Sequence, residues 1–122
     1  MTYFEGFLVP VPEANKEAYR KSAADFAPIF REYGVKRHVE AWDSDVHEGK
    51  VTDFPKAVDA KADEKVVFSW FEYPDRAARD AANEKMMSDP RMKEMGESMP
   101  FDGKRMIVGG FDAIVEEGSE HG

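Results

Sequence analysis

The fold is decided by residues 65–73, which read Lys-Val-Val-Phe-Ser-Trp-Phe-Glu-Tyr. β-Branched and aromatic residues dominate this stretch, and such residues favour a strand within a sheet. Alternate residues of a strand point to opposite faces, so the stretch divides into two sets. The sets are Val67, Ser69, Phe71 and Tyr73 on one face, and Val66, Phe68, Trp70 and Glu72 on the other. Both faces carry large apolar side chains, which predicts a sheet that is covered on both sides.

Three further segments have the composition of strands. They span residues 3–11, 35–42 and 106–115. Two helical patterns separate them, so the order is strand, helix, strand, strand, helix, strand. This order predicts an α+β fold of the ferredoxin-like βαββαβ type, in which two helices cover one face of an antiparallel sheet. We expect a single domain over residues 1–115 and a flexible acidic tail over residues 116–122.

The helical segments are indicated by apolar spacing and by end signals. Aromatic and apolar residues recur every three or four positions from Tyr19 to Tyr33, and Pro28 is expected to kink or break this helix near Ala27. A second helix is expected from Pro74-Asp75 to Ser88. The motif Asp89-Pro90 then predicts a short helix, because Asp caps helices and Pro favours the first turn. Another short helix is expected near residues 55–60, within the long connection 43–64.

Two helices can cover only one face of this sheet. The other face would expose Phe7, Phe68 and Trp70 as a large apolar patch, and such patches mark interaction surfaces. Two copies that pair these faces would form a dimeric α+β barrel, so we expect a homodimer. In the alternative, the polar connection 43–64 folds back over the open face of a monomer.

Composition limits the classes of partner. The 122-residue chain has 25 acidic and 17 basic residues, which disfavours a nucleic-acid partner because phosphate binding draws on Lys and Arg. It has no cysteine, which excludes disulfides and thiolate metal sites. No segment approaches the roughly 20 apolar residues that cross a membrane, and the first residues are not those of a secretory signal. We therefore expect a soluble cytoplasmic protein without a membrane partner.

Four motifs resemble the bacterial YbaA-like family. They are Val51-Thr52-Asp53-Phe54, Val66-Val67-Phe68-Ser69-Trp70, Met86-Met87-Ser88-Asp89-Pro90-Arg91-Met92 and Ser98-Met99-Pro100-Phe101-Asp102-Gly103-Lys104-Arg105-Met106. The resemblance covers nearly the whole chain and implies the dimeric α+β barrel fold. It supplies no catalytic residue to carry over, because the family is itself of unknown activity, and no cofactor is expected.

Polar residues on the strands predict a site inside the barrel. If the helix-covered face is purely apolar, Val39 and Ala41 point toward the helices and their neighbours point toward the barrel. The barrel-facing set is then His38, Glu40, Trp42, Glu5, Trp70, Glu72 and Asp112. His38 and Glu40 are the candidate catalytic residues, with His38 as a general base acting on a small aromatic or enol-like substrate. The other five are candidate ligand-binding residues.

Less specific interpretations stay open. His38 and Glu40 can be hydrogen-bonded or exposed at the sheet edge without a catalytic role. The motif His38-x-Glu40 also offers two metal ligands, but a site needs a third, and His47 lies in a loop while His121 lies in the tail. No metal is therefore expected. The chain is predicted to bind or transform a small organic molecule, or else to be a non-catalytic interaction or ligand-binding module.

Overall fold

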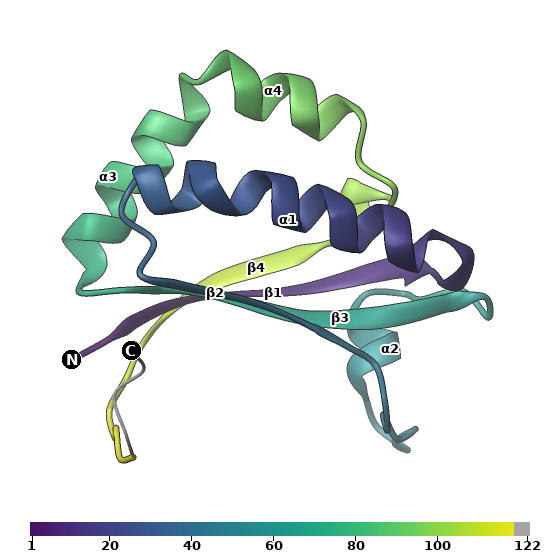
Figure 1. Ribbon diagram of the computed structural model, residues 1–122. Helices are drawn as coiled ribbons and strands as arrows, with labels where there is room; N and C mark the ends of the chain where they lie inside the picture. Colours follow the sequence, from purple (N-terminus) through teal and green to yellow (C-terminus); the bar gives the residue numbers. More distant parts are fainter. Residues whose placement is uncertain (119–122) are drawn as a thin grey trace.

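A computed structural model describes residues 1–118 as a four-stranded antiparallel sheet with a helical layer on one face (Figure 1). The strands are β1 (Tyr3–Pro12), β2 (Arg37–Trp42), β3 (Glu64–Tyr73) and β4 (Ile107–Asp112). Their order across the sheet is β2-β3-β1-β4. The predicted ferredoxin-like α+β fold is therefore confirmed.

Three helices form the layer over the sheet: α1 (Lys16–Glu32), α3 (Arg76–Met87) and α4 (Pro90–Glu97). The single turn α2 (Phe54–Ala57) lies on the opposite side (Figure 1). A kink or a break was predicted near Ala27, and the break does not occur, because α1 continues through Pro28. Pro28 is exposed, so water can reach the carbonyl that its ring leaves unpaired.

Aspartates begin the three helices that follow β2. Asp53, Asp75 and Asp89 each accept a hydrogen bond from a backbone N–H of the first turn, at 2.7, 2.8 and 2.8 Å. These contacts satisfy donors that a helix start leaves free. The capping signals in the sequence therefore located all three helix starts.

The core lies between the helical layer and the sheet. One cluster of buried residues joins both layers and contains Tyr3, Phe26, Phe30, Val35, Phe71, Tyr73 and Ala82. A second, beneath the start of α1, contains Val9, Val11, Tyr19 and Val67. Burial of these side chains holds the helices on this face of the sheet.

The strand register corrects the predicted faces of β1, β2 and β4. Glu5 and His38 both pair with Phe71, and Glu40 pairs with Ser69. Directly opposed residues share a face of the sheet, and Phe71 packs against Phe30 of α1. Five residues predicted to face the barrel therefore lie on the helix side, namely Glu5, His38, Glu40, Trp42 and Asp112, and Phe7 joins them.

The physical reason is that the helix-covered face is not purely apolar. Helices α1 and α3 supply polar partners to Glu40 and Glu5, so carboxylates can be placed beneath them. Trp70 and Glu72 do lie on the open face, as predicted, where Trp70 Nε1 donates to Glu72 at 2.9 Å. Val39 and Ala41 lie on the same open face, opposite Trp70 and Phe68.

Two segments descend past the open face, one at each end (Figure 1). The connection between β2 and β3, with α2, descends at one end, and Phe54 lies 6.4 Å from Phe68 between ring centroids. Phe68 is still 50% exposed, so this connection covers only one end of the face. At the other end Glu116 accepts hydrogen bonds from the backbone N–H and the hydroxyl of Thr2. Residues 119–122 of the expected tail lie outside the described residues.

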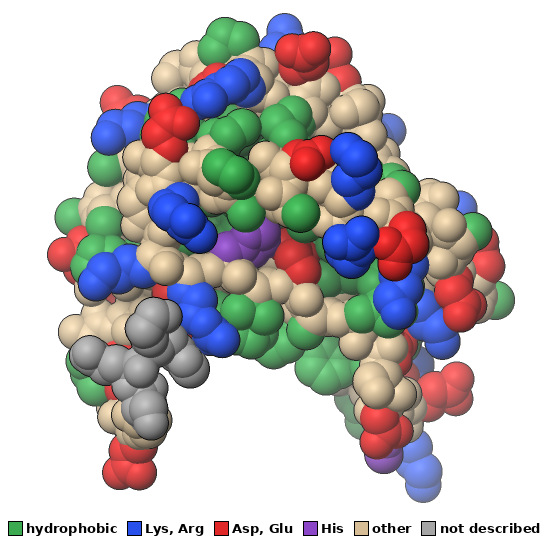
Figure 2. All heavy atoms as spheres, in the orientation of Figure 1, with side chains coloured by type: hydrophobic (Ala, Val, Ile, Leu, Met, Phe, Trp, Pro, Cys, Tyr) green, Lys and Arg blue, Asp and Glu red, His purple; other side chains and the backbone are tan. Residues whose placement is uncertain are grey.

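Apolar side chains are visible on the underside of the sheet between these two segments (Figure 2). The exposed members of this face include Phe68, Ile107 and Phe111. Within residues 1–118, none of the helices has the length and apolar character needed to cross a membrane.

Candidate functional site

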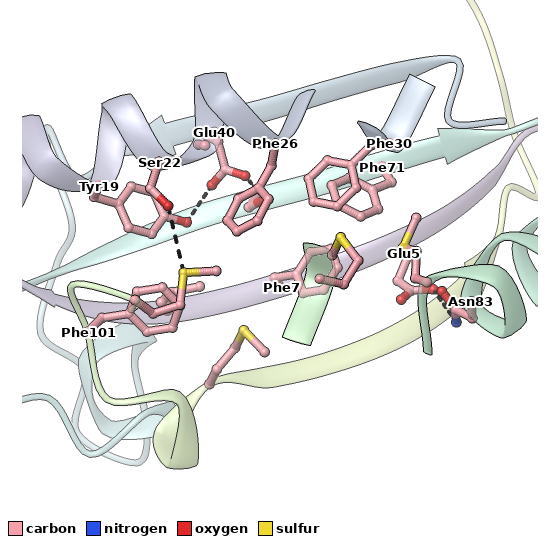
Figure 3. A pocket seen from close by; sticks show the side chains of 17 residues that line it. Glu5, Phe7, Tyr19, Ser22, Phe26, Phe30, Glu40, Phe71, Asn83 and Phe101 are labelled. Atoms are coloured by element: carbon pink, nitrogen blue, oxygen red, sulfur yellow. Dashed lines mark hydrogen bonds between the residues drawn. The ribbon is translucent and has the colours of Figure 1, made fainter. Parts of the chain in front are cut away.

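A cavity of about 240 Å³ lies between the helical layer and the sheet (Figure 3). Most of its lining is aromatic or methionine side chains, and polar groups are few. The lining residues are Glu5, Phe7, Val9, Tyr19, Ser22, Ala23, Phe26, Phe30, Glu40, Ser69, Phe71, Asn83, Met86, Met92, Met99, Phe101 and Met106. Apolar concave sites with a few polar groups are typical of small-molecule binding.

The cavity follows from the spacing of residues on α1. Tyr19, Ala23, Phe26 and Phe30 recur at intervals of four, three and four, so one helical face looks down on the sheet. The opposite walls come from α3, α4 and the segment before β4, which supply four methionines. Methionine is flexible and fills irregular space, so this wall can adapt to a ligand.

Glu40 forms a polar centre at one end of the cavity (Figure 3). Its Oε1 accepts a hydrogen bond from the Tyr19 hydroxyl at 2.6 Å, and its Oε2 accepts one from Ser69 Oγ at 2.9 Å. His38 Nε2 shares a further hydrogen bond with Oε2. Burial and the adjacent Glu40 carboxylate raise the pKa of Tyr19 well above its ordinary value, so Tyr19 stays a neutral donor.

Glu5 forms a second polar centre at the other end. Its Oε2 accepts hydrogen bonds from Arg79 at 3.1 Å and from Asn83 at 3.4 Å, both on α3. The phenol of Tyr73 is fully buried and has no hydrogen-bond partner within residues 1–118. Burial and then the charge of Glu5 raise the pKa of Tyr73. Two carboxylates thus stand at opposite ends of an apolar chamber.

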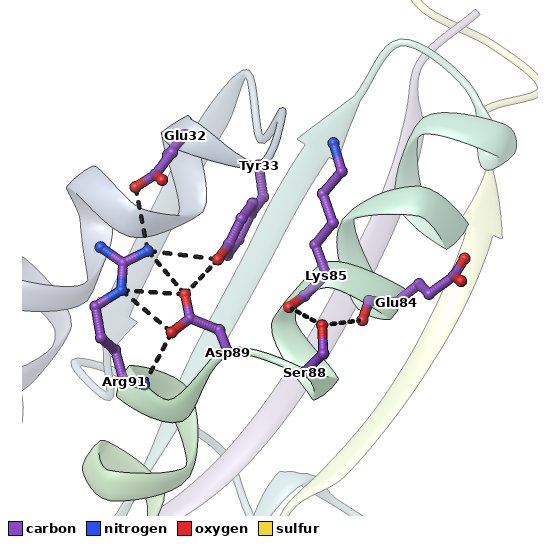
Figure 4. Close-up of polar contacts among 7 residues, drawn as sticks. All are labelled: Glu32, Tyr33, Glu84, Lys85, Ser88, Asp89 and Arg91. Carbon is purple, nitrogen blue, oxygen red and sulfur yellow. Dashed lines mark hydrogen bonds and ion pairs between the residues drawn. The ribbon is translucent and has the colours of Figure 1, made fainter.

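The roof of the cavity is fixed where α3 meets α4 (Figure 4). Asp89 accepts hydrogen bonds from the Tyr33 hydroxyl, which follows α1, and from the Arg91 guanidinium at 2.7 Å. Arg91 and Tyr33 lower the pKa of Asp89, which therefore stays ionised. This cluster holds the start of α4 against the end of α1 and so places Met92 over the chamber.

The predicted site residues fall into three groups. Glu5 and Glu40 line the cavity, and His38 contacts Glu40 from outside it. Trp42 lies on the helix side next to the second core cluster, with Lys16 Nζ 5.4 Å from the centre of its ring. Trp70 and Glu72 lie on the opposite face, and Asp112 is exposed at the sheet edge. The single barrel site expected from the sequence is therefore not formed by these seven residues within one chain.

Sequence reasoning missed the polar partners of the two carboxylates. Tyr19 and Ser69 hold Glu40, and Arg79 and Asn83 hold Glu5. Tyr19 was readable only as part of an apolar stripe, although its hydroxyl needs a partner when buried. Ser69 offered a weak indication of a polar partner. It is a buried polar residue on a face of β3 that is otherwise filled by Val, Phe and Tyr.

Metal ligation has no support in the side-chain arrangement. Across the part of the chain that the structure describes, no three His, Asp or Glu side chains are grouped so that they could hold a metal ion. His38 and Glu40 do form the adjacent pair noted in the sequence, but His47 pairs with Asp45 in an exposed loop. His121 lies outside the described residues.

Comparison with known proteins places the chain among uncharacterised relatives. The family described as "Protein of unknown function (DUF1428)" matches residues 2–103. The "Uncharacterized protein YbaA" of Escherichia coli K12 is 64% identical over 117 residues, which cover 96% of this chain and 100% of that protein. The same identity and coverage hold for the protein of that name from Shigella flexneri. The resemblance to the YbaA-like family is therefore confirmed.

Solved structures of low sequence identity share the fold. A dimeric ferredoxin-like protein from an uncultured marine organism has a TM-score of 0.63 and 14% identity, over 96% of this chain and 99% of that one. A dimeric ferredoxin-like protein of unknown function from Jannaschia sp. CCS1 has a TM-score of 0.57 and 15% identity, over 93% and 100% of the two chains. These likenesses confirm the ferredoxin-like fold.

Proposed function

The chain belongs to the DUF1428 family of proteins of unknown function, and we propose that it binds a small neutral aromatic molecule between its helices and its sheet. The observation that carries this proposal is the apolar cavity of about 240 Å³ with a carboxylate at each end. An engineered apolar cavity of about 150 Å³ holds benzene. The larger cavity therefore suits a substituted ring or two fused rings.

Charge limits the class of ligand. Glu5 and Glu40 line the cavity, and Glu5 is ion-paired with Arg79 behind it, whereas no Lys or Arg pairs with Glu40 or lines the cavity within residues 1–118. An anionic ligand would meet the Glu40 carboxylate in a site of low polarity, which is unfavourable. A neutral ligand with hydrogen-bonding groups at its ends avoids this cost, and its ring can pack against Phe7, Phe26 and Phe71.

The open face supports a second part of the proposal, a homodimer closed sheet to sheet. Phe68 and Phe111 are 50% and 62% exposed there, and a patch of this kind favours a partner. The fold neighbours from the marine organism and from Jannaschia are described as dimeric. The two segments that descend at the ends of the face would flank the second copy (Figure 1).

A cavity-filling variant tests the ligand site. We expect the wild-type protein to bind 2-indanone, a neutral bicyclic ketone, in isothermal titration calorimetry. Ala23→Phe places a ring inside the cavity and should weaken binding by about tenfold or more, which is about 1.4 kcal/mol. Ala24→Phe is the matched control, because Ala24 is exposed on the same helix and the substitution should leave binding unchanged.

Equal binding by the two variants would place the ligand elsewhere. In that case the non-catalytic interaction module expected as the alternative would become the better account, with the open face as its functional surface. The cytoplasmic location and the lack of a nucleic-acid partner stay predictions from composition.

A further inference from the structure

The contact between His38 and Glu40 joins two separate cavities. Glu40 lines the apolar chamber under the helices, whereas His38 lines a larger polar cleft of about 890 Å³ on the outer side. The cleft is also lined by Arg31, Lys36 and Arg37, and basic side chains gather along this margin of the molecule in Figure 2. The side chain of His38 is 11% exposed and contacts Glu40, so its imidazole links a residue that lines the chamber to the cleft.

Glu40 is held so that part of its carboxylate remains available to a ligand. A carboxylate has about four acceptor positions, and three are occupied by Tyr19, Ser69 and His38. The side chain of Glu40 is 24% exposed, and it is among the residues that line the chamber. Tyr19 and Ser69 are fixed donors, and His38 is a third donor in the tautomer with its proton on Nε2; together they orient the carboxylate for proton transfer.

The same end of the chamber contains a hydroxyl that a ligand can use. Ser22 lines the chamber one helical turn after Tyr19, and its hydroxyl has only a weak contact with Met99 Sδ at 3.8 Å. Sulfur is a poor acceptor, so Ser22 Oγ can donate instead to a ligand oxygen near Glu40. A base and a hydroxyl donor at one end of an aromatic chamber suit a carbonyl compound with an acidic C–H bond.

We propose that Glu40 is a catalytic base for neutral aromatic carbonyl compounds and that His38 is a positioning residue that holds the Glu40 carboxylate. This proposal rests on the proposed ligand site. The C–H bond next to the carbonyl breaks and its electron pair forms the enolate, whose oxygen accepts a hydrogen bond from Ser22. The proton forms an O–H bond on Glu40.

Glu40 completes the exchange with solvent itself. Its side chain is 24% exposed, so the proton on its carboxyl exchanges with water. A proton taken from water then passes from Glu40 to the enolate carbon or oxygen, which gives exchange or tautomerisation without any other reactant. His38 contacts Glu40 Oε2 through Nε2 and holds the carboxylate, so it is a positioning residue.

Deuterium exchange of 2-indanone in D2O tests the base and its positioning residue, with loss of the CH2 signal followed by proton NMR. General acid–base catalysis typically contributes about 100-fold or more, so Glu40→Gln should lower the protein-catalysed rate by about that factor. His38→Gln should lower exchange roughly tenfold while 2-indanone still binds with unchanged affinity. His47→Gln, in an exposed loop, is the matched control and should exchange at the wild-type rate.

The other outcomes separate the ligand site, the base and the role of His38. Binding without exchange above the buffer rate would remove the catalytic proposal and leave the ligand site. Wild-type exchange by Glu40→Gln would exclude Glu40 as the base, and wild-type exchange by His38→Gln would exclude the positioning role of His38. If Glu40→Gln does not fold, Ser22→Ala provides the second test, because loss of the enolate donor should slow exchange without abolishing binding. Failure of the wild-type protein to bind 2-indanone would overturn the ligand site itself.

Discussion

The two faces of the sheet are both rich in aromatic residues, but their carboxylates have different hydrogen-bond partners. On the helix side, Glu5 accepts a hydrogen bond from Arg79 of α3, which is 74 residues away in the chain. Glu40 accepts one from Tyr19 of α1, which is 21 residues away. On the open side Glu72 is paired within the sheet, with Trp70 and Arg37. A carboxylate on a strand therefore does not mark the open face, because tertiary partners can satisfy it beneath helices.

The largest expected difference between the faces is in monomer stability. Phe71 is 7% exposed and packs against Phe7, Phe30 and His38, so Phe71→Ala should reduce the free energy of unfolding by about 3–5 kcal/mol. Urea denaturation measures this value. Phe54→Ala is the control and should cost less than about 1 kcal/mol, because Phe54 is 48% exposed. Similar losses for both variants would mean that the helix side does not hold the core.

The next effect concerns association through the open face. Phe68→Asp places a charge in the proposed dimer interface and should raise the dimer dissociation constant by about 100-fold, or about 3 kcal/mol. Analytical ultracentrifugation measures the change. Met87→Asp is the matched control, since Met87 is 89% exposed on the helical side. The comparison between the faces would fail if Met87→Asp dissociated the dimer and Phe68→Asp did not.

The smallest effect is expected at the segment that descends past β4. Hydrogen bonds from Thr2 lower the pKa of Glu116 in the folded protein. A carboxylate with a lowered folded pKa stabilises the protein above its unfolded pKa, and this contribution is lost as the pH falls through the folded value. Glu116→Gln should therefore lower the melting temperature slightly near neutral pH and not at all in strong acid.

Glu117→Gln is the control for this measurement. Glu117 is exposed beside Glu116, and its substitution should leave the melting temperature unchanged at both pH values. A difference between wild type and Glu116→Gln that persisted in strong acid would argue against the contact with Thr2 as its cause.

The strand and helix order was predictable from the sequence because it depends on local patterns. β-Branched and aromatic composition located the strands, and Asp89-Pro90 with the aspartates near Pro55 and Pro74 located helix starts. The faces of β3 were also predicted correctly, with Trp70 and Glu72 on the open side.

The site was not predictable, because it depends on register and on distant partners. Polar residues of β1, β2 and β4 were assigned to the open face on the assumption of a purely apolar helix side, and the register places them on the helix side instead. Local sequence contains no signal that Arg79 will reach Glu5 or that Tyr19 will reach Glu40. That His38 and Glu40 share one face of β2 was expected from their spacing, whereas their contact under α1 required the fold.

The proposed ligand lies under the helices and not between paired sheets. NMR of protein with 13C-labelled methionine methyl groups, titrated with 2-indanone, tests this placement directly. Met86, Met92, Met99 and Met106 line the chamber, whereas Met87 is exposed. We expect intermolecular NOEs from 2-indanone to the methyl groups of the first four and none to Met87. NOEs to the aromatic protons of Phe68 and Trp70 without contacts to the chamber methionines would contradict the account.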